Sequence, residues 1–258
     1  MYNFSIIIPL YNESIRLPNL ILKLSEYLKN FQYNYELILV DDGSEDDTLE
    51  IIKSFQQTNK KIEVVSGPHI GQFHSIIKGI ENAKNEYSII LEGDLSADPK
   101  YLSQMIEYLP DYDLVTGSRY LNNSKVLHKS VSRDLLSKIF IILFFSLFKS
   151  KLSDPQFSFK IYKNKFFLEI AKNLLSRSDG MKSTEMMLYH EAYGYKIKEI
   201  PIDYSFVESD RNLPKGKIFY TLKTATLGLL DVWKSCKKKY KKGNFKKKVT
   251  RFNFLWFM

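Results

Sequence analysis

Cysteine is nearly absent from this chain of 258 residues, which holds only Cys236. One cysteine cannot form an internal disulfide or a cysteine-based zinc cluster, so the chain is compatible with a reducing compartment. The four histidines lack the spacing of metal ligands. The sequence also shows no Ser/His/Asp hydrolase arrangement and no GxxxxGK loop that would cradle phosphates.

Long apolar runs are missing as well. Residues 4–10 form a short run without a basic flank, and polar residues follow it, so we do not expect a signal peptide. Residues 139–148 are apolar almost all round, but a transmembrane helix needs about 20 such residues. This segment predicts either a buried core helix or a helix in a membrane interface. A second amphipathic segment, residues 218–233, favours the interface.

Acidic residues are missing from the C-terminal region. Residues 234–251 hold ten Lys and Arg and no acid, whereas the rest of the chain has 28 Lys and Arg against 29 Asp and Glu. The aromatic ending FNFLWFM favours a bilayer, because aromatic rings settle at the headgroup level. A solvated tail is the alternative. We expect no nucleic acid as partner, since the basic residues are not interleaved with stacking positions.

Short β runs alternate with helical patterns through the first half of the chain. The expected strands are residues 4–9, 36–41, 62–66, 87–92 and 113–117, and the expected helices are residues 17–29, 48–57, 72–83 and 99–108. This alternation predicts an α/β fold with a mostly parallel sheet. Ligands bind such sheets beyond the carboxyl ends of the strands. Polar clusters follow four of these strands, which predicts a site at that edge.

Two acidic turns are the main candidates for ligand binding. Asp41 closes an apolar strand, where it can hydrogen-bond a ribose or base, and Gly43 lets the backbone turn close to a ligand. A capping box of Ser44 and Asp47 is a compatible structural interpretation.

The second acidic turn holds Glu92 and Asp94, one residue apart at a strand end. Two such carboxylates can share a divalent cation that bridges a diphosphate. The structural alternative is an acidic turn before a helix that is capped by Asp98, with Pro99 at its first position. Arg119 and Arg133 can each fork onto phosphate oxygens, although a lone arginine is typical of a surface ion pair.

Five stretches, taken in order, resemble family 2 glycosyltransferases. They are IIIPLYNE (6–13), VDDGS (40–44), LEGD (91–94), TGSRY (116–120) and DPQFSFK (154–160). The first two are specific for the family. TGSRY, with Arg133 and Ser137 further along, is similar to the dolichyl- or polyprenyl-phosphate mannosyl- and glucosyltransferases. The resemblance covers roughly residues 4–207.

The resemblance implies a GT-A fold, Mg²⁺ or Mn²⁺, and a nucleoside-diphosphate sugar donor, either GDP-mannose or UDP-glucose. The implied acceptor is a polyprenyl or dolichyl phosphate, and the implied outcome is inversion at the sugar. The implied residues are Pro9, Tyr11, Glu13, Asp41 and Gly93 for the donor; Glu92, Asp94 and Ser96 for the metal; Arg119, Arg133 and Ser137 for the acceptor phosphate; and Gln156 near the donor sugar. Asp94, Arg119, Arg133 and Gln156 would carry catalysis.

The expected organisation is a GT-A catalytic domain over residues 1–210, including an interface helix at about 135–149. An amphipathic helix and polybasic tail follow over residues 211–258. Together they predict peripheral attachment at the cytoplasmic face of a membrane. Several motifs depart from the family pattern: Glu92 replaces the first aspartate of Asp-x-Asp, and residues 71–74 replace a Gly-Lys-Gly-like run. Residues 156–159 and 183–185 also differ from the family pattern. We expect these differences to affect which sugar is used and how fast it is transferred, rather than the fold.

Two other functions remain open at this stage. The chain could extend a glycan acceptor, which would need a general base, with Glu185 or Asp154 as candidates. It could also be a non-catalytic membrane adaptor of the same fold.

Overall fold

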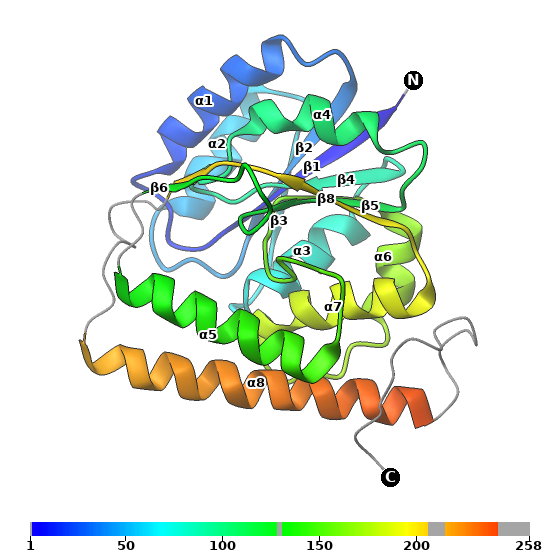
Figure 1. The fold of residues 1–258 in the computed structure, drawn as a ribbon. Helices are drawn as coiled ribbons and strands as arrows, with labels where there is room; N and C mark the ends of the chain where they lie inside the picture. The colour runs from blue at the N-terminus through cyan, green and yellow to red at the C-terminus, as the bar shows by residue number, and fades with distance from the viewer. Residues whose placement is uncertain (1, 128–130, 206–214, 242–258) are drawn as a thin grey trace.

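A computed structural model describes residues 2–127, 131–205 and 215–241, and the side chains of residues 131–134, 215–219 and 239–241 lie outside this description. Figure 1 shows a central sheet with helices on both faces and a further pair of helices along one side. The alternation of predicted strands with predicted helices indicated this layered arrangement, and the structure confirms it.

Seven strands form the central sheet, in the order β3-β2-β1-β4-β7-β5-β8. They are β1 (Asn3–Leu10), β2 (Asn34–Asp41), β3 (Ile62–Ser66), β4 (Tyr87–Ile90), β5 (Leu114–Ser118), β7 (Lys160–Lys163) and β8 (Ile197–Pro201). All neighbours are parallel except those of β7, which is antiparallel to both β4 and β5. A small parallel pair is formed by β6 (Val126–Leu127) and β9 (Tyr204–Ser205).

The helices cover the sheet in two sets. One face carries α1 (Leu17–Lys29), α2 (Thr48–Thr58) and α4 (Leu102–Glu107), which follows a 3₁₀ turn at Pro99–Tyr101. The other face carries α3 (Gln72–Glu81), α6 (Asn164–Ala171) and α7 (Asp179–Tyr193). In β1, Ile6 and Ile8 enter the first core while Ile7 enters the second, as alternation along a strand requires. Strand β1 is thus buried on both faces.

The antiparallel strand β7 matters most for the site. It lies between β4 and β5, and its first residue, Lys160, is in register with Ile90 and with Thr116. Because it runs against its neighbours, it begins at the edge where they end. The segment before it, residues 154–159, therefore reaches the carboxyl edge of the sheet.

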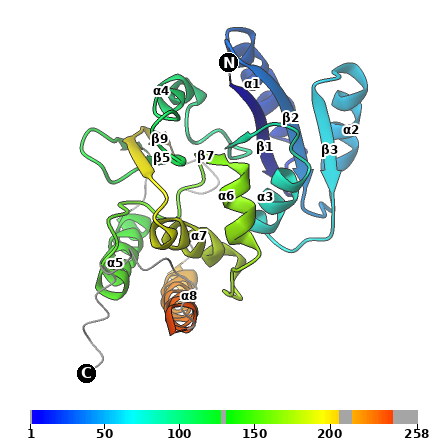
Figure 2. The same cartoon turned by 90° about the vertical axis from the view of Figure 1, so that its right-hand side faces the viewer.

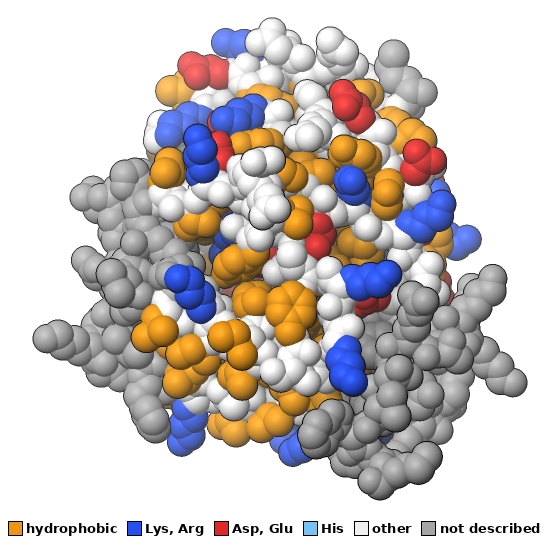
Figure 3. Space-filling model, viewed as in Figure 1, with side chains coloured by type: hydrophobic (Ala, Val, Ile, Leu, Met, Phe, Trp, Pro, Cys, Tyr) orange, Lys and Arg blue, Asp and Glu red, His pale blue; other side chains and the backbone are white. Residues whose placement is uncertain are grey.

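The outermost helices are α5 (Val131–Phe148) and α8 (Lys215–Lys241), which pack side by side (Figures 1 and 2). Both extend beyond the predicted segments. Leu229 and Val232 of α8 join the second core, whereas Ile142 and Leu227 are 64% and 56% exposed. Figure 3 shows hydrophobic side chains gathered over this part of the surface. Within the described ranges, no helix combines the length and apolarity that crossing a bilayer requires.

One predicted helix cap is wrong and another is confirmed. Asp47 stands at the N-cap of α2 without a side-chain capping bond, and the Ser44 hydroxyl instead accepts from the Asn12 amide at 3.0 Å. The capping box was therefore not formed, because Ser44 is used to tie the turn after β2 to the turn after β1. Asp98 does cap the next helical segment, accepting from the Lys100 amide at 2.8 Å.

Candidate active site

A cavity of about 390 Å³ lies at the carboxyl ends of β1, β2 and β4, and we call it the first cavity. It brings together six of the residues predicted from sequence: Pro9, Tyr11, Glu13, Glu92, Gly93 and Asp94. They come from turns far apart in the chain, which meet because neighbouring parallel strands end at the same edge.

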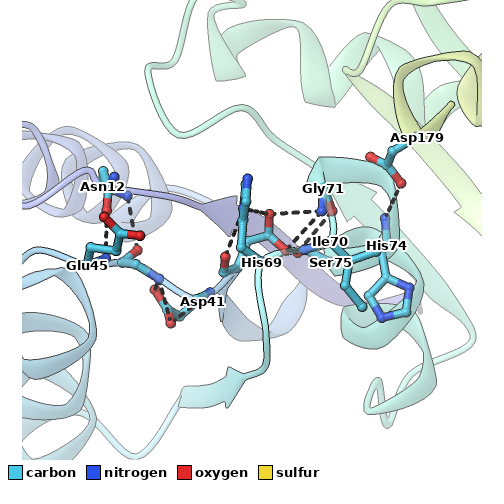
Figure 4. A network of polar contacts seen from close by, with 12 residues as sticks. Asn12, Asp41, Glu45, His69, Ile70, Gly71, His74, Ser75 and Asp179 are labelled. Carbon is cyan, nitrogen blue, oxygen red and sulfur yellow. Dashed lines mark hydrogen bonds and ion pairs between the residues drawn. The ribbon is translucent and has the colours of Figure 1, made fainter.

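Asp42, rather than Asp41, reaches this cavity. Its buried carboxylate accepts from the amides of Ile70 and Gly71, at 3.2 and 3.1 Å, and from the Ser75 hydroxyl at 3.0 Å. The Asp41 carboxylate accepts from the amides of its own turn, at Gly43 and Ser44, both at 3.2 Å. Figure 4 shows both arrangements. Asp41 therefore fixes the turn, and Asp42 joins that turn to the loop before α3.

The alternation of side chains along β2 predicts which face of the sheet each of the two aspartates points to. Leu37 and Leu39 of β2 enter the first core, while Ile38 and Val40 enter the second. The next residue that faces the second core is Asp42, and the loop that it binds opens α3 on that same face.

The wall of the first cavity carries a pair of stacked rings. Tyr11 and His69 have ring centroids 3.9 Å apart and planes 17° apart. The Nδ1 atom of His69 is 2.8 Å from the Asp42 carboxylate, which orients the imidazole. Gly43 has φ +71, and a Cβ there would lie 2.5 Å from the backbone nitrogen of His69. Only glycine fits this turn, so the close approach expected at Gly43 is made to the chain's own loop.

Glu92 and Asp94 lie beside the first cavity and fit one divalent cation. The Asp94 carboxylate accepts from the Ser96 amide at 2.9 Å, and Leu95 between them has φ 49, a conformation uncommon for a non-glycine residue. One carboxylate oxygen of Glu92 is buried without a hydrogen-bond partner among the described residues. Burial, reinforced by the Asp94 charge, raises the pKa of Glu92 to about 7.

The candidate metal site consists of these two carboxylates. The described part of the chain contains no cluster of three or more His, Cys, Asp or Glu side chains suited to a metal. Mg²⁺ is commonly held by one or two carboxylates together with substrate phosphates and water. The donor set therefore suits a cation that arrives with a diphosphate. Ser96, also predicted as a ligand, is buried and does not line the first cavity.

Arg119 anchors a second cavity of about 240 Å³, between the end of β5 and helices α5 and α8. Its Nε and Nη2 atoms donate to the two carboxylate oxygens of Asp154, at 2.7 and 2.9 Å. Asp154 is only 1% exposed. Burial alone would lower the pKa of Arg119, but the Asp154 charge outweighs it and raises that pKa above its ordinary value. The guanidinium is thus charged and fixed in place.

The second cavity also receives other predicted residues. Ser137 of α5 and Gln156 both line it, and the Gln156 amide donates to the Gly180 carbonyl at 3.1 Å. Its remaining lining is mainly apolar, from α5 and α8. Arg133 belongs to α5, but its side chain lies outside the described residues.

A third cavity of about 290 Å³ adjoins the other two. It shares Glu92 with the first cavity, and it shares Arg119 and Gln156 with the second. Lys160 lines it from β7 and is only 2% exposed. Sequence reasoning gave Lys160 no role, although a lysine between Phe159 and Ile161 in an apolar segment is a signal of a buried charge.

Comparisons with known proteins give the chain a family. A family model described as glycosyl transferase family 2 matches residues 5–171. Glycosyltransferase AglD of Haloferax volcanii is 25% identical over 230 residues, which cover 87% of this chain and 35% of that protein. The undecaprenyl-phosphate 4-deoxy-4-formamido-L-arabinose transferase of Aeromonas hydrophila is 32% identical over 132 residues, covering 50% and 40%. This chain thus spans at most about two-fifths of the length of either relative.

A solved structure supports the same fold. Glucosyl-3-phosphoglycerate synthase of Mycobacterium tuberculosis, in complex with Mn²⁺ and UDP-glucose, matches with a TM-score of 0.61 at 14% identity. The match covers 90% of this chain and 79% of that one. At this identity the likeness concerns the fold alone.

Proposed function

The chain belongs to glycosyltransferase family 2 and is a glycosyltransferase of GT-A fold, and from this premise we propose that it transfers mannose or glucose from a nucleoside-diphosphate sugar to a polyprenyl or dolichyl phosphate. One observation carries the proposal: the three cavities adjoin in a fixed order and share lining residues. A donor, a transferred sugar and an acceptor need three adjoining spaces of this kind.

The first cavity suits the nucleoside diphosphate. Tyr11 and His69 offer aromatic surface to a base, and Glu13 offers a carboxylate to hydroxyl or ring N–H groups. Asp42 acts by orienting His69. Asp41 acts in this proposal by holding the turn that places Asp42. The third cavity then receives the sugar, and the second receives the acceptor phosphate.

Glu92 and Asp94 would hold Mg²⁺ or Mn²⁺ at the end of the first cavity. When bound, the cation supplies charge neutralisation of the diphosphate leaving group. The structural relative solved with Mn²⁺ and UDP-glucose supports the use of a divalent cation in this fold. The Glu92 oxygen that has no hydrogen-bond partner among the described residues would gain one in the cation.

In the proposed reaction, an acceptor phosphate oxygen attacks the anomeric carbon in line. The bond from that carbon to the diphosphate breaks as the new bond forms, so the configuration inverts. A phosphate monoester with a second pKa of about 6 is already largely anionic at neutral pH, and no side chain has to remove a proton. Arg119, held by Asp154, positions the incoming phosphate together with Ser137 and Arg133.

The engagement of both candidate bases disfavours a glycan acceptor. The Asp154 carboxylate is occupied by Arg119. Glu185 is fully buried and accepts from the amides of Leu175 and Ser176, at 3.0 and 2.7 Å. A hydroxyl acceptor would need one of these carboxylates to be available as a base.

Membrane attachment is part of the proposal. The second cavity opens between α5 and α8, and exposed apolar side chains of both helices, including Ile142 and Leu227, lie close to it in sequence. This placement supports peripheral binding at the cytoplasmic face of a membrane, where a lipid phosphate would enter. The polybasic segment after residue 241 lies outside the described residues. In this proposal residues 1–210 carry catalysis and residues 211–258 carry attachment.

The test is an acceptor comparison. Wild-type protein with Mn²⁺ is first screened with UDP and GDP for a rise in melting temperature. The matching radiolabelled UDP-glucose or GDP-mannose is then offered with polyprenyl phosphate or with free saccharides. We expect the radiolabel to enter the organic phase when polyprenyl phosphate is the acceptor and not when a free saccharide is. The anomeric configuration of the product should be inverted. Label transferred to saccharides and none to the lipid phosphate would overturn the proposal.

A further inference from the structure

Lys160 is the one strongly buried ammonium that faces the third cavity in the described part of the chain. It stands at the start of β7, and Gln156, Ser158 and Tyr162 line the same cavity at alternate positions. Gln156 and Ser158 belong to the segment before β7, and within the strand the period of two places Lys160 and Tyr162 on the face toward α3 and α7. The site of the ammonium is therefore set by the strand and not by a mobile loop.

The ammonium lacks a close partner. Among the described residues its only hydrogen bond goes to the Ser183 hydroxyl at a long 3.4 Å, and no carboxylate lies within ion-pair distance. The charges of Asp154 and Glu92 act on it from farther away, and burial, the larger effect, lowers the pKa of Lys160 to about 8. A buried charge without close hydrogen bonds is costly. A bound ligand would remove that cost.

The cavity has the size and polarity for a monosaccharide. At about 30 Å³ for each water-sized group, 290 Å³ holds roughly ten such groups. Its other charged wall residues are Glu92, Arg119 and Asp179. Arg119 is held by Asp154, and the Asp179 carboxylate accepts from the amides of Phe73 and His74, at 2.8 and 3.2 Å. Lys160 is thus the donor with the most unused capacity, since an ammonium carries three N–H groups.

We propose that Lys160 is a specificity-determining residue that donates hydrogen bonds to hydroxyl oxygens of the transferred sugar. This inference rests on the proposed function and deepens it. Because Lys160 lines the third cavity and not the first, a nucleoside diphosphate without sugar does not reach it. The contribution of Lys160 is therefore confined to the sugar portion of the donor.

The test compares two ligands on two proteins. Calorimetry with Mn²⁺ measures binding of UDP and UDP-glucose, or of GDP and GDP-mannose, whichever pair the wild-type protein binds. Lys160→Met keeps the length of the side chain and removes its charge and donors. We expect a loss of about 10- to 100-fold for the sugar nucleotide, as for a hydrogen bond to a charged group, and less than twofold for the nucleoside diphosphate.

The matched control is Lys163→Met on the same strand. Lys163 is partly exposed and pairs with Glu86 at 3.1 Å, away from the cavity, so both affinities should stay at wild-type values. The melting temperature of Lys160→Met should equal or exceed that of the wild type, since a buried charge without a close partner is removed.

Two results would overturn the inference. Equal losses for both ligands with a lowered melting temperature would make Lys160 a structural neutraliser of its acidic neighbours. Unchanged affinity for the sugar nucleotide would show that Lys160 does not touch the sugar. If wild-type protein bound no sugar nucleotide at all, the proposed function itself would fail, and that outcome is distinct from both.

Discussion

The first and second cavities are built by different means. Around the first, carboxylates are fixed by backbone amides: Asp42 by the loop before α3, and Asp94 by Ser96. Around the second, apolar side chains of α5 and α8 form most of the wall, and Arg119 supplies the charge. The first is thus a rigid polar site, and the second is an apolar groove with one anchored cation. The contrast teaches that one end suits a small charged ligand and the other a lipid with an anionic head.

The largest effect is expected at the first cavity, the polar one of the two. Asp94→Ala removes a carboxylate of the proposed metal site, and transfer should fall by at least about 10³-fold, as when a main electrostatic stabiliser of the transition state is lost. Radiolabel transfer to polyprenyl phosphate measures it, and circular dichroism should show an unchanged fold.

Asp98→Ala is its control. Asp98 caps the 3₁₀ turn four residues later, outside the lining of the first cavity, so activity should persist. Wild-type rates in Asp94→Ala would contradict the metal assignment.

The second effect concerns the anchored cation. Asp154→Asn removes the buried partner of Arg119, and the free energy of unfolding should fall by about 3 kcal/mol, because one charge of a buried pair is left uncompensated. Urea denaturation measures the change. Glu86→Gln, which breaks the exposed pair with Lys163, should cost less than about 1 kcal/mol. Similar losses in both variants would show that Arg119 is not anchored through Asp154.

The third effect concerns α7, whose N-terminal residues line the third cavity. Burial lowers the pKa of His190 from 6.5 to about 4, so the folded protein keeps this imidazole neutral. As pH falls below 6.5, the unfolded chain takes up the proton first, and stability is lost down to about pH 4. From pH 7 to pH 4.5 this amounts to about 2 kcal/mol.

His190→Phe should remove that portion of the acid sensitivity. Urea unfolding of the variant and the wild type at the two pH values measures it. An equal loss of stability in both proteins would mean that His190 is not the group responsible.

The smallest effect is expected at the exposed apolar surface of α5 and α8. Ile142→Ser with Leu227→Ser reduces the exposed apolar surface of α5 and α8, and binding to vesicles that contain anionic lipid should weaken about tenfold. Sedimentation with the vesicles measures it. Leu22→Ser is the control, since this leucine is exposed and belongs to α1, a helix on the opposite side of the sheet from α5 and α8 (Figure 1). Unchanged sedimentation of the double variant would separate these helices from membrane binding.

The sequence predicted the first half of the sheet and the first cavity better than the parts of the molecule around β7 and α7. Helix α1 was predicted at its observed bounds, and β3 likewise, because their periodicity is local. The first cavity followed from strand ends that must converge. Asp42 was missed in favour of its neighbour, since the acidic pair was not assigned to faces by strand alternation.

The rest depends on distant contacts. Strand β7 has only four residues, KIYK, without an alternating pattern, and its place between β4 and β5 cannot be derived from local preference. Helix α7 buries Glu185 and His190 along with its apolar residues, so it shows no clear apolar stripe. Lys160 was overlooked for the same reason, since its burial follows from where β7 is inserted.

The insertion of β7 also has a consequence for the order in which the chain folds. Strands β4 and β5 follow one another along the chain, yet in the sheet they are joined only through β7, which begins more than 40 residues after β5 begins. A nascent chain that ends before residue 160 would leave an edge of each strand without its partner, and such edges promote association between chains. The join between β4 and β5, and with it protection of these edges from aggregation, must await synthesis of β7.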